Sequence, residues 1–264
     1  MIRIIRADIY RVLRDKALYI ALAIVLSMVT LFTFVFQSVP EIFSIFILTF
    51  DDDAMVTNFA DGATAAQMAL SLIPALFVIF LPLFRAVTIG YQQGILKNEI
   101  SAGFSRTQLY LSKWILSSIL SMIYALIFFT LTVLFATLLS DFGDWSNGFL
   151  VSILQSLGVM MLFVVAFTSV GVFLSFLFKT AYVVVEVYLF ALLVPLLLAA
   201  ILGLSGSPIG DAIIFFCLST QATRFANISG MAQADIITGL AVCLAFIVIP
   251  TVVGIFRFRK VEIK

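Results

Sequence analysis

The residues that can do chemistry are few in this chain, and they gather in one polar stretch. Residues 91–114, YQQGILKNEISAGFSRTQLYLSKW, carry Lys97, Glu99, Arg106 and Lys113 in a chain that is 63% hydrophobic and 11% charged. An average soluble domain has roughly 25% charged residues. Charged side chains in such a setting can pair with a protein partner or with lipid phosphates. The stretch is therefore a candidate docking site.

The residue types of the common catalytic sites are missing. The chain has no His, no zinc-binding motif and no G-x-S-x-G elbow, so zinc and triad chemistries lack their usual residues. It also lacks the phosphate loop G-x-x-x-x-G-K-[ST], so we expect it to bind neither ATP nor any other cofactor by itself. The two cysteines, Cys217 and Cys243, are predicted to be small buried hydrophobic residues without a mutual disulfide or a metal.

Glu186 is the only acidic residue inside a long apolar run. An ionisable group within a membrane is a functional hypothesis by default. However, Glu186 follows Tyr182 by four residues, about 6 Å along a helix, so its carboxylate can reach the aqueous surface and pair with Lys179. Structural anchoring and a gating or proton-transfer role are both open interpretations of this residue.

The elements that must position these residues are apolar runs long enough to cross a bilayer. A hydrocarbon core about 30 Å thick needs roughly 20 apolar residues per helix. The sequence offers six runs of suitable length, at about 18–36, 68–89, 114–139, 149–178, 182–204 and 236–256. We predict an all-α, multi-pass integral membrane protein with six transmembrane helices in a single domain, residues 1–264.

Charge is distributed unevenly between alternate loops. All Lys and Arg residues except Arg224 fall at the N-terminus, within residues 85–113, at Lys179 or at the C-terminus. The other loops hold most of the acidic residues, including Asp141. The positive-inside rule therefore places both termini and residues 91–114 in the cytoplasm.

Two further segments are predicted to lie along the membrane surface. Before the first span, apolar residues recur at steps of three and four: Ile2, Ile5, Ile9 and Val12. Arginines occupy the other faces, so we expect an interfacial helix whose basic side meets lipid headgroups or an acidic partner, or serves only as a topology signal. Between the last two spans, residues 205–233 include the apolar stretch 211–219, which is too short to cross. We predict a re-entrant or interfacial outer helix there.

Within the polar stretch, the pattern predicts two helices joined by a tight turn. Residues 94–102 form a short amphipathic helix, with Leu96, Ile100 and Phe104 on one side and Lys97, Asn98 and Ser101 elsewhere. Gly103 is a suitable stop. Ser105 and Gln108 then match a capping box, so a second helix is expected to begin at Ser105 and continue into the third span.

The same stretch, GILKNEISAGFSRTQLYLSK, resembles the cytoplasmic segment of type-2 ABC transporter permeases. The usual form of that segment is close to "G-T-hydrophobic-K-x-x-hydrophobic-S-x-G-x-S-R". The matching residues are Gly94, Lys97, Ser101, Gly103, Ser105, Arg106 and the later Lys113. Ile95 replaces the usual Thr. The motif covers about 20 residues, and the interfacial helix, the six spans and the outer segment extend the resemblance over nearly the whole chain.

This resemblance implies an assembly in the bacterial cytoplasmic membrane. Its expected partners are two copies of a cytoplasmic ATP-binding subunit, which would bind ATP and magnesium, and a second permease copy or a paralogue. Membrane lipids are also expected partners, and nucleic acid is not. The residues implied in coupling to the ATPase are Gly94, Leu96, Lys97, Asn98, Glu99, Ile100, Ser101, Gly103, Phe104, Ser105 and Arg106.

The function implied by the resemblance is ATP-driven export of a hydrophobic or amphipathic substrate such as a peptide, an antibiotic or a lipid-like molecule. A peptide cargo is suggested by analogy with the short permeases of peptide export and of immunity to peptide antibiotics. One alternative is an ion-coupled secondary transporter using Glu186, although such proteins usually carry several buried acids or broken helices at the bilayer midplane. Another is a membrane anchor or sensor that recruits a soluble partner through the same stretch.

Overall fold

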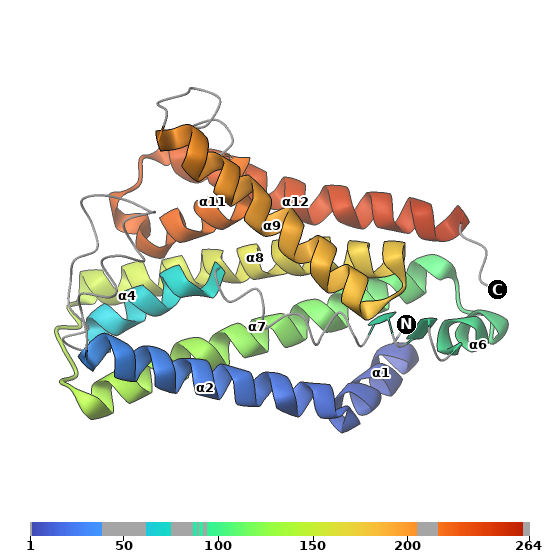
Figure 1. Cartoon of the computed structure of the whole chain (residues 1–264), viewed down its shortest axis with the longest axis horizontal. Coiled ribbons are helices and arrows are strands. Elements are labelled where there is room, and N and C mark those ends of the chain that lie inside the picture. Colours follow the sequence, from blue (N-terminus) through green and yellow to red (C-terminus); the bar gives the residue numbers. More distant parts are fainter. Residues whose placement is uncertain are drawn as a thin grey trace.

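The computed structural model describes residues 2–38, 62–74, 87–88, 90–91, 94–204 and 216–260, and this part of the chain is helical with no β-strand. Its elements are α1 (Ile2–Arg14), α2 (Lys16–Ser38), α4 (Gly62–Leu72), α6 (Ile95–Ser101), α7 (Arg106–Leu139), α8 (Asn147–Phe178), α9 (Ala181–Leu204), α11 (Leu218–Arg224), the 3-10 helix η2 (Phe225–Gly230) and α12 (Gln233–Lys260). The long helices lie side by side as an elongated bundle (Figure 1). The predicted all-α class is confirmed for the described residues.

Within the described ranges, three helices are long and apolar enough to cross a membrane: α7, α8 and α12. They contain the runs predicted at 114–139, 149–178 and 236–256. The runs predicted at 18–36 and 182–204 fall inside α2 and α9. The run at 68–89 begins within α4, but residues 75–86 and 89 lie outside the described ranges. The chain is thus an α-helical membrane protein.

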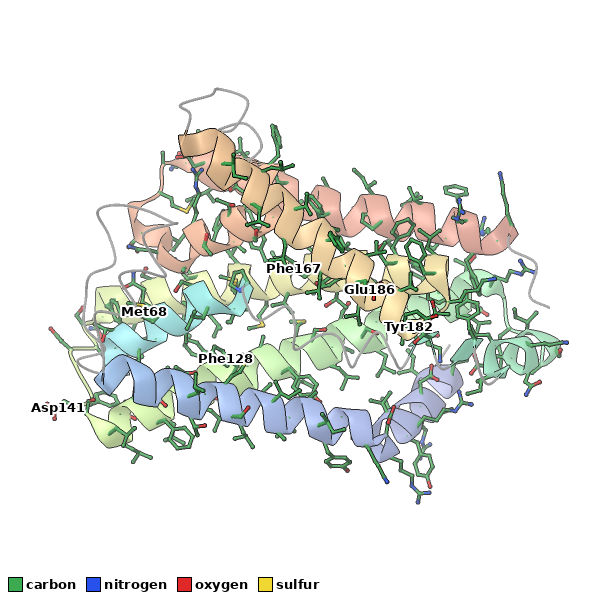
Figure 2. The ribbon with its side chains drawn as sticks, in the orientation of Figure 1. Met68, Phe128, Asp141, Phe167, Tyr182 and Glu186 are labelled. Carbon is green, nitrogen blue, oxygen red and sulfur yellow. The ribbon has the colours of Figure 1, made fainter. Side chains whose placement is uncertain are left out.

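The helices run alternately between the two ends of the bundle, and this separates the charges. The start of α1, the helix α6, the turn between α8 and α9 and the end of α12 lie at one end (Figure 1). The turn between α7 and α8 lies at the opposite end and carries Asp141 (Figure 2). Basic residues from distant parts of the sequence therefore gather around α6.

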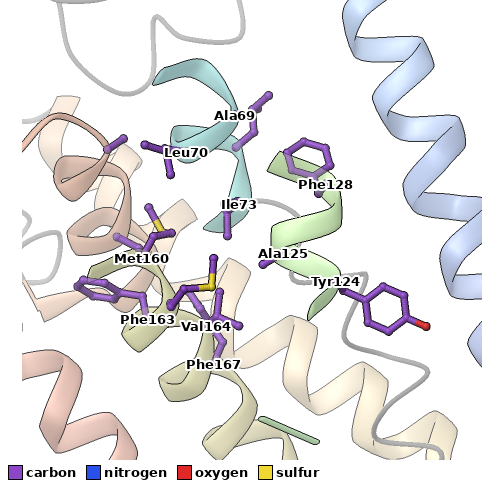
Figure 3. Close-up of a cluster of buried hydrophobic side chains, with 14 of the residues drawn as sticks. Ala69, Leu70, Ile73, Tyr124, Ala125, Phe128, Met160, Phe163, Val164 and Phe167 are labelled. Atoms are coloured by element: carbon purple, nitrogen blue, oxygen red, sulfur yellow. The ribbon is translucent and has the colours of Figure 1, made fainter. Parts of the chain in front are cut away.

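The main core lies where α4 meets α7 and α8. Ala65, Ala66 and Ala69 are fully buried on α4, and small side chains of this kind allow close helix approach. Figure 3 shows Ala69 and Leu70 of α4 above the α8 side chains Phe163 and Val164, with Phe128 of α7 to one side. A further set of residues completes the core, including Tyr124, Ala125, Met160 and Phe167. These contacts fix the relative positions of α7 and α8.

Several polar side chains inside the bundle form hydrogen bonds with hydroxyl groups. The Ser121 hydroxyl donates to the Ser117 carbonyl at 2.8 Å, and Thr168 of α8 donates to Ser121 Oγ at 2.9 Å. Trp114 Nε1 donates to Ser169 Oγ at 2.8 Å. Such bonds between and within helices compensate for the lack of water in an apolar bundle.

The segment before α12 packs on the bundle. Phe225, at the start of η2, is completely buried and lies 5.4 Å from the Phe163 ring of α8, centroid to centroid. The Ile228 backbone N–H donates to Ser156 Oγ of α8 at 3.3 Å. Residues 205–215, which include most of the predicted apolar stretch 211–219, lie outside the described ranges. Cys217 and Cys243 are free cysteines, and both are buried, as predicted.

The helix α1 is present, but Val12 of its predicted apolar side is buried against the protein. Ile4, Asp8 and Val12, spaced by four residues, are buried, whereas Ile9 and Leu13 are exposed. Periodicity identified the helix correctly. It assigned Val12 to the lipid-facing side because the pattern could not indicate that α7 would cover this line of residues.

A close approach between α7 and α12 depends on Gly254. Tyr110 of α7 is fully buried, and its hydroxyl donates to the Pro250 carbonyl of α12 at 3.5 Å. A Cβ atom on Gly254 would overlap the Tyr110 ring and hydroxyl, so only glycine allows this packing. The contact lies near the α6 end. It joins α12 to α7, the helix that begins within the polar stretch.

We expect Gly254→Ala to lower the free energy of unfolding by about 1–3 kcal/mol, because the added methyl group overpacks the contact with Tyr110. The matched control is Gly158→Ala in α8, where an added Cβ meets open space. This control should be neutral or gain up to about 1 kcal/mol of helix propensity. Unfolding in mixed detergent micelles measures both. Equal stability of the two variants would contradict the packing argument.

Candidate functional site

The polar stretch folds as a helix, a tight turn and a second helix. We call α6, the turn and the start of α7 the elbow. Phe104 N–H donates to the Glu99 carbonyl at 3.3 Å and Gly103 N–H to the Ile100 carbonyl at 2.9 Å, which is the Schellman pattern. Gly103 has φ 89°, a left-handed conformation that favours glycine. Gly94 starts α6 in the same region, with φ 67°. The predicted short helix and its glycine stop are confirmed.

The second helix, α7, begins with the predicted capping box. The Ser105 hydroxyl accepts from Gln108 N–H at 3.3 Å, and the Gln108 side-chain oxygen accepts from Ser105 N–H at 3.3 Å. Two backbone donors at the helix start are thereby satisfied. Because α7 then continues without interruption to Leu139, the turn is joined directly to a helix long enough to span the membrane.

The apolar side of α6 faces the protein's own interior. Leu96 is 1% exposed, and its side chain lies on the side of Gly90 that a Cβ atom would occupy. Ile100 and Phe104 are half-buried against an apolar cluster at this end of the bundle. The buried members of the cluster are Ile4, Val87, Leu109, Tyr110, Val172, Phe176 and Phe258. Five segments of the chain thus provide the base on which α6 sits.

The outward side of α6 is polar. Lys97, Asn98 and Ser101 are exposed, as are Gly103 and Ser105 at the turn. Any protein that docks on this elbow must therefore contact these residues rather than the apolar side. Sequence periodicity had separated the two sides correctly, but it could not tell which one faces the protein.

Aromatic rings stiffen the base beneath α6. The Phe176 ring lies 4.8 Å from Phe258, 4.7 Å from Tyr110 and 5.7 Å from Tyr91, measured between ring centroids. Edge and tilted contacts at these distances are favourable. Burial raises the pKa of Tyr91 and the positive charge of Arg106 opposes the rise, so its phenol stays protonated.

Four ionised side chains connect three helices across the site. Lys113 Nζ of α7 lies 2.5 Å from Asp8 Oδ1 of α1. Arg11 Nη1 of α1 lies 3.3 Å from the same Asp8 oxygen and 3.2 Å from Glu99 Oε1 of α6. The order Lys113, Asp8, Arg11, Glu99 alternates in sign, and the four charges sum to zero. We name these four residues the charge chain.

The inner half of the charge chain is buried. Asp8 is 3% exposed and Lys113 is 5% exposed. Removing one partner of a buried ion pair leaves an uncompensated charge in a low-dielectric setting, which is more costly than losing both. The outer pair, Arg11 and Glu99, is more exposed, and solvent screens it. The charge chain therefore has a strong structural end and a weak end on α6.

Asp8 was not among the residues singled out from the sequence. A signal was present, since Asp8 lies on the same line as Ile4 and Val12, where a carboxylate is costly unless it is paired. The partner, however, is Lys113, more than a hundred residues away, and only the fold brings the two together. The structure also assigns Glu99 a partner within the chain, Arg11.

Arg106 joins the turn to the end of α12. Its guanidinium donates to the carbonyl oxygens of Phe258 and Arg259 at 3.2 and 2.8 Å. The carbonyls at a helix C-terminus carry partial negative charge, so a cation is favourable there. Arg259 in turn donates from Nε to Thr107 Oγ1 at 3.1 Å. The beginning of α7 and the end of α12 are thus linked in both directions.

The other candidate residue, Glu186, lies away from this site. It is exposed on α9, one turn beyond Tyr182 (Figure 2). Of the ion pairs in the described part of the chain, none joins Glu186 to Lys179. The Lys179 ammonium lies instead 5.7 Å from the centre of the Tyr91 ring, within the range of a cation–π contact.

The comparisons with known proteins do not identify a family: no family model matches the chain, and no curated protein matches it significantly. The fold and the site define a class, an α-helical membrane protein with a helix–turn–helix unit connected to the bundle by a charge chain at one end.

We expect Asp8→Asn to lower the free energy of unfolding by about 3–5 kcal/mol, because it leaves the Lys113 ammonium buried without a counter-charge. Asp8→Asn combined with Lys113→Met should recover part of that loss, since no buried charge remains. A double-mutant cycle in mixed detergent micelles measures the coupling. Additive losses from the two single variants would contradict a direct buried pair.

Arg11→Gln is expected to loosen α6 without unfolding the bundle. The lost pair is partly exposed, so amide exchange in residues 95–101 should accelerate by up to about fivefold, corresponding to roughly 1 kcal/mol. Hydrogen exchange with mass spectrometry reports this region directly. Arg14→Gln is the control, because the Arg14 guanidinium lies 4.5 Å from the Tyr10 ring on the same helix. Equal exchange in both variants would show that Arg11 does not hold α6.

Proposed function

We propose that this chain is the membrane-spanning permease subunit of an ATP-driven exporter, with ATP hydrolysed by a separate cytoplasmic subunit. The substrate is a hydrophobic or amphipathic molecule such as a peptide, an antibiotic or a lipid-like compound. The proposal includes the full six-span topology, with both termini in the cytoplasm of a bacterial cell and a second permease copy or a paralogue completing the translocation unit.

One observation carries the proposal: α6 presents a polar outer face while its apolar side is buried within the chain. Helices this short are marginal in isolation. The aromatic cluster beneath α6 and the ion pair between Glu99 and Arg11 stabilise it. A force applied to the outer face would therefore pass through the turn into α7 and through the charge chain into α1. This is the mechanical link that a permease needs if a partner supplies the energy.

The gathering of basic residues at the α6 end supports the proposed orientation. Lys97, Arg106, Lys113 and Lys179 lie at that end together with the basic end of α12. The positive-inside rule assigns such an end to the cytoplasm, where ATPase subunits are found. The opposite end carries Asp141 and Asp144 on the turn between α7 and α8.

An ion-coupled transporter receives less support, because it needs acids that face the bundle interior. Glu186 is exposed on α9, and the buried acid Asp8 is neutralised by Lys113 near the surface end of α7. A membrane anchor or sensor uses the same elbow for recruitment. Disrupting the elbow would abolish recruitment in either case. Only a permease would also lose transport.

The test is co-purification of a protein with a phosphate loop, using the full chain from its native cells in mild detergent. Lys97→Glu combined with Ser101→Tyr changes two exposed positions on the outer face of α6. We expect the amount of ATPase subunit recovered to fall at least about tenfold, equivalent to roughly 1.4 kcal/mol of binding free energy. Mass spectrometry identifies and quantifies the partner.

Arg257→Glu, at an exposed position near the end of α12, is the matched control and should retain the ATPase subunit. Leu96 is unsuitable as a docking variant because a polar residue at this buried position would disturb the base of α6. Failure of any ATPase subunit to co-purify with the wild-type chain would contradict the proposal. Substrate efflux from vesicles containing the intact complex then distinguishes a permease from an anchor.

A further inference from the structure

The helix α1 has three distinct sides. One side, with Ile4, Asp8 and Val12, is buried against the bundle. A second side is apolar and open, because Ile9 is 42% exposed and Leu13 is 52% exposed. Arg6 is exposed at the edge of this apolar side, on one face with Leu13, and Arg11 and Arg14 are exposed on the remaining surface. A helix that packs on protein along one side and still exposes both apolar and basic side chains requires a second, amphipathic environment.

Burial of Asp8 makes the outward charge of α1 uniformly positive. The carboxylate of Asp8 is paired with Lys113 and Arg11, so it contributes little negative potential at the outer surface. Asp15, between α1 and α2, is half-buried. In residues 4–16 the exposed ionised side chains are all basic, namely Arg6, Arg11, Arg14 and Lys16, and of these Arg11 is paired with Asp8 and Glu99. The charge complement of this surface is an anion.

The open apolar side of α1 is continuous with a surface that lipid must cover. Tyr19 and Ile20, at the start of α2, are 60% and 56% exposed, and exposed apolar residues continue along α2 to Leu31. The Tyr19 hydroxyl donates to the Leu13 carbonyl at 3.0 Å, so α1 and α2 meet at a fixed bend. Figure 1 shows α1 turning away from the axis of α2 at the end that carries α6.

We propose that the outer surface of α1 binds the anionic phospholipid headgroups of the adjoining leaflet. Ile9 and Leu13 enter the upper acyl region, and Arg6 and Arg14 contact lipid phosphates. The apolar continuity with α2 favours a lipid surface over an acidic protein, because a soluble partner would have to cover an apolar strip that already borders the bilayer. This inference rests on the fold and does not require the proposed transport function.

Anchoring α1 in this way would set the position of α6. Arg11 pairs with Glu99, and Asp8 pairs with Lys113, so α1, α6 and the start of α7 form one connected unit. A fixed depth of α1 in the headgroup layer then fixes how far α6 projects into the cytoplasm. Each basic residue near an anionic leaflet strengthens binding by about fivefold at moderate salt.

The test places a fluorophore on α1 in the full chain reconstituted in phosphatidylcholine vesicles. Ile9→Cys provides an exposed thiol for NBD labelling, whereas the native Cys217 and Cys243 are buried, and the parent chain controls for their reactivity. Quenching is compared between spin-labelled phosphatidylglycerol and spin-labelled phosphatidylcholine at equal mole fraction. We expect the anionic quencher to be at least about fivefold more effective per molecule, with the difference shrinking as salt rises.

Arg6→Gln with Arg14→Gln should reduce this preference to near unity, and Arg6→Lys with Arg14→Lys should retain it. Arg257→Gln with Lys260→Gln removes two exposed charges from α12 at the same end of the bundle and should leave the preference unchanged. Equal quenching by both lipids in the wild-type background would overturn the proposal. So would the absence of quenching by either lipid, which would place Ile9 in water or under a protein partner.

Discussion

The ion pair between Asp8 and Lys113 is the interaction on which the candidate site depends. Both groups are almost completely buried, and an isolated charge in such a setting would cost several kcal/mol. The pair is therefore stable only when α1 lies directly against the start of α7. This constraint fixes α1, and α1 then presents Arg11 to Glu99 on α6. One buried charge pair thus holds α1 against α7, and the weaker pair of Arg11 and Glu99 extends the connection to α6.

The direction in which α6 faces follows from the aromatic base beneath it. Leu96 is buried at the edge of a cluster that includes Tyr110 and Phe258, and Arg106 binds the end of α12. The apolar side of α6 is consequently used for intramolecular packing. Its polar side faces outward, so the proposed partner would recognise this elbow by charge and hydrogen bonding more than by apolar contact.

Local elements were predicted accurately because their causes are local. The capping box of Ser105 and Gln108 involves atoms only three residues apart, and the Schellman turn at Gly103 requires a residue that adopts positive φ. The long helices followed from apolar runs of suitable length. Asp8 was missed because its partner lies on another helix, and Val12 was placed on the lipid-facing side because aliphatic residues occur on both sides of α1.

The sequence by itself determined that the chain is helical and apolar enough for a membrane, and it located the polar elbow, because composition and short-range hydrogen bonding are properties of neighbouring residues. Only the tertiary structure decided that α6 turns Leu96 inward, that Glu99 pairs with Arg11 and that Glu186 stays outside the site. Those outcomes depend on contacts between helices far apart in the chain, and a one-dimensional pattern does not encode which faces meet.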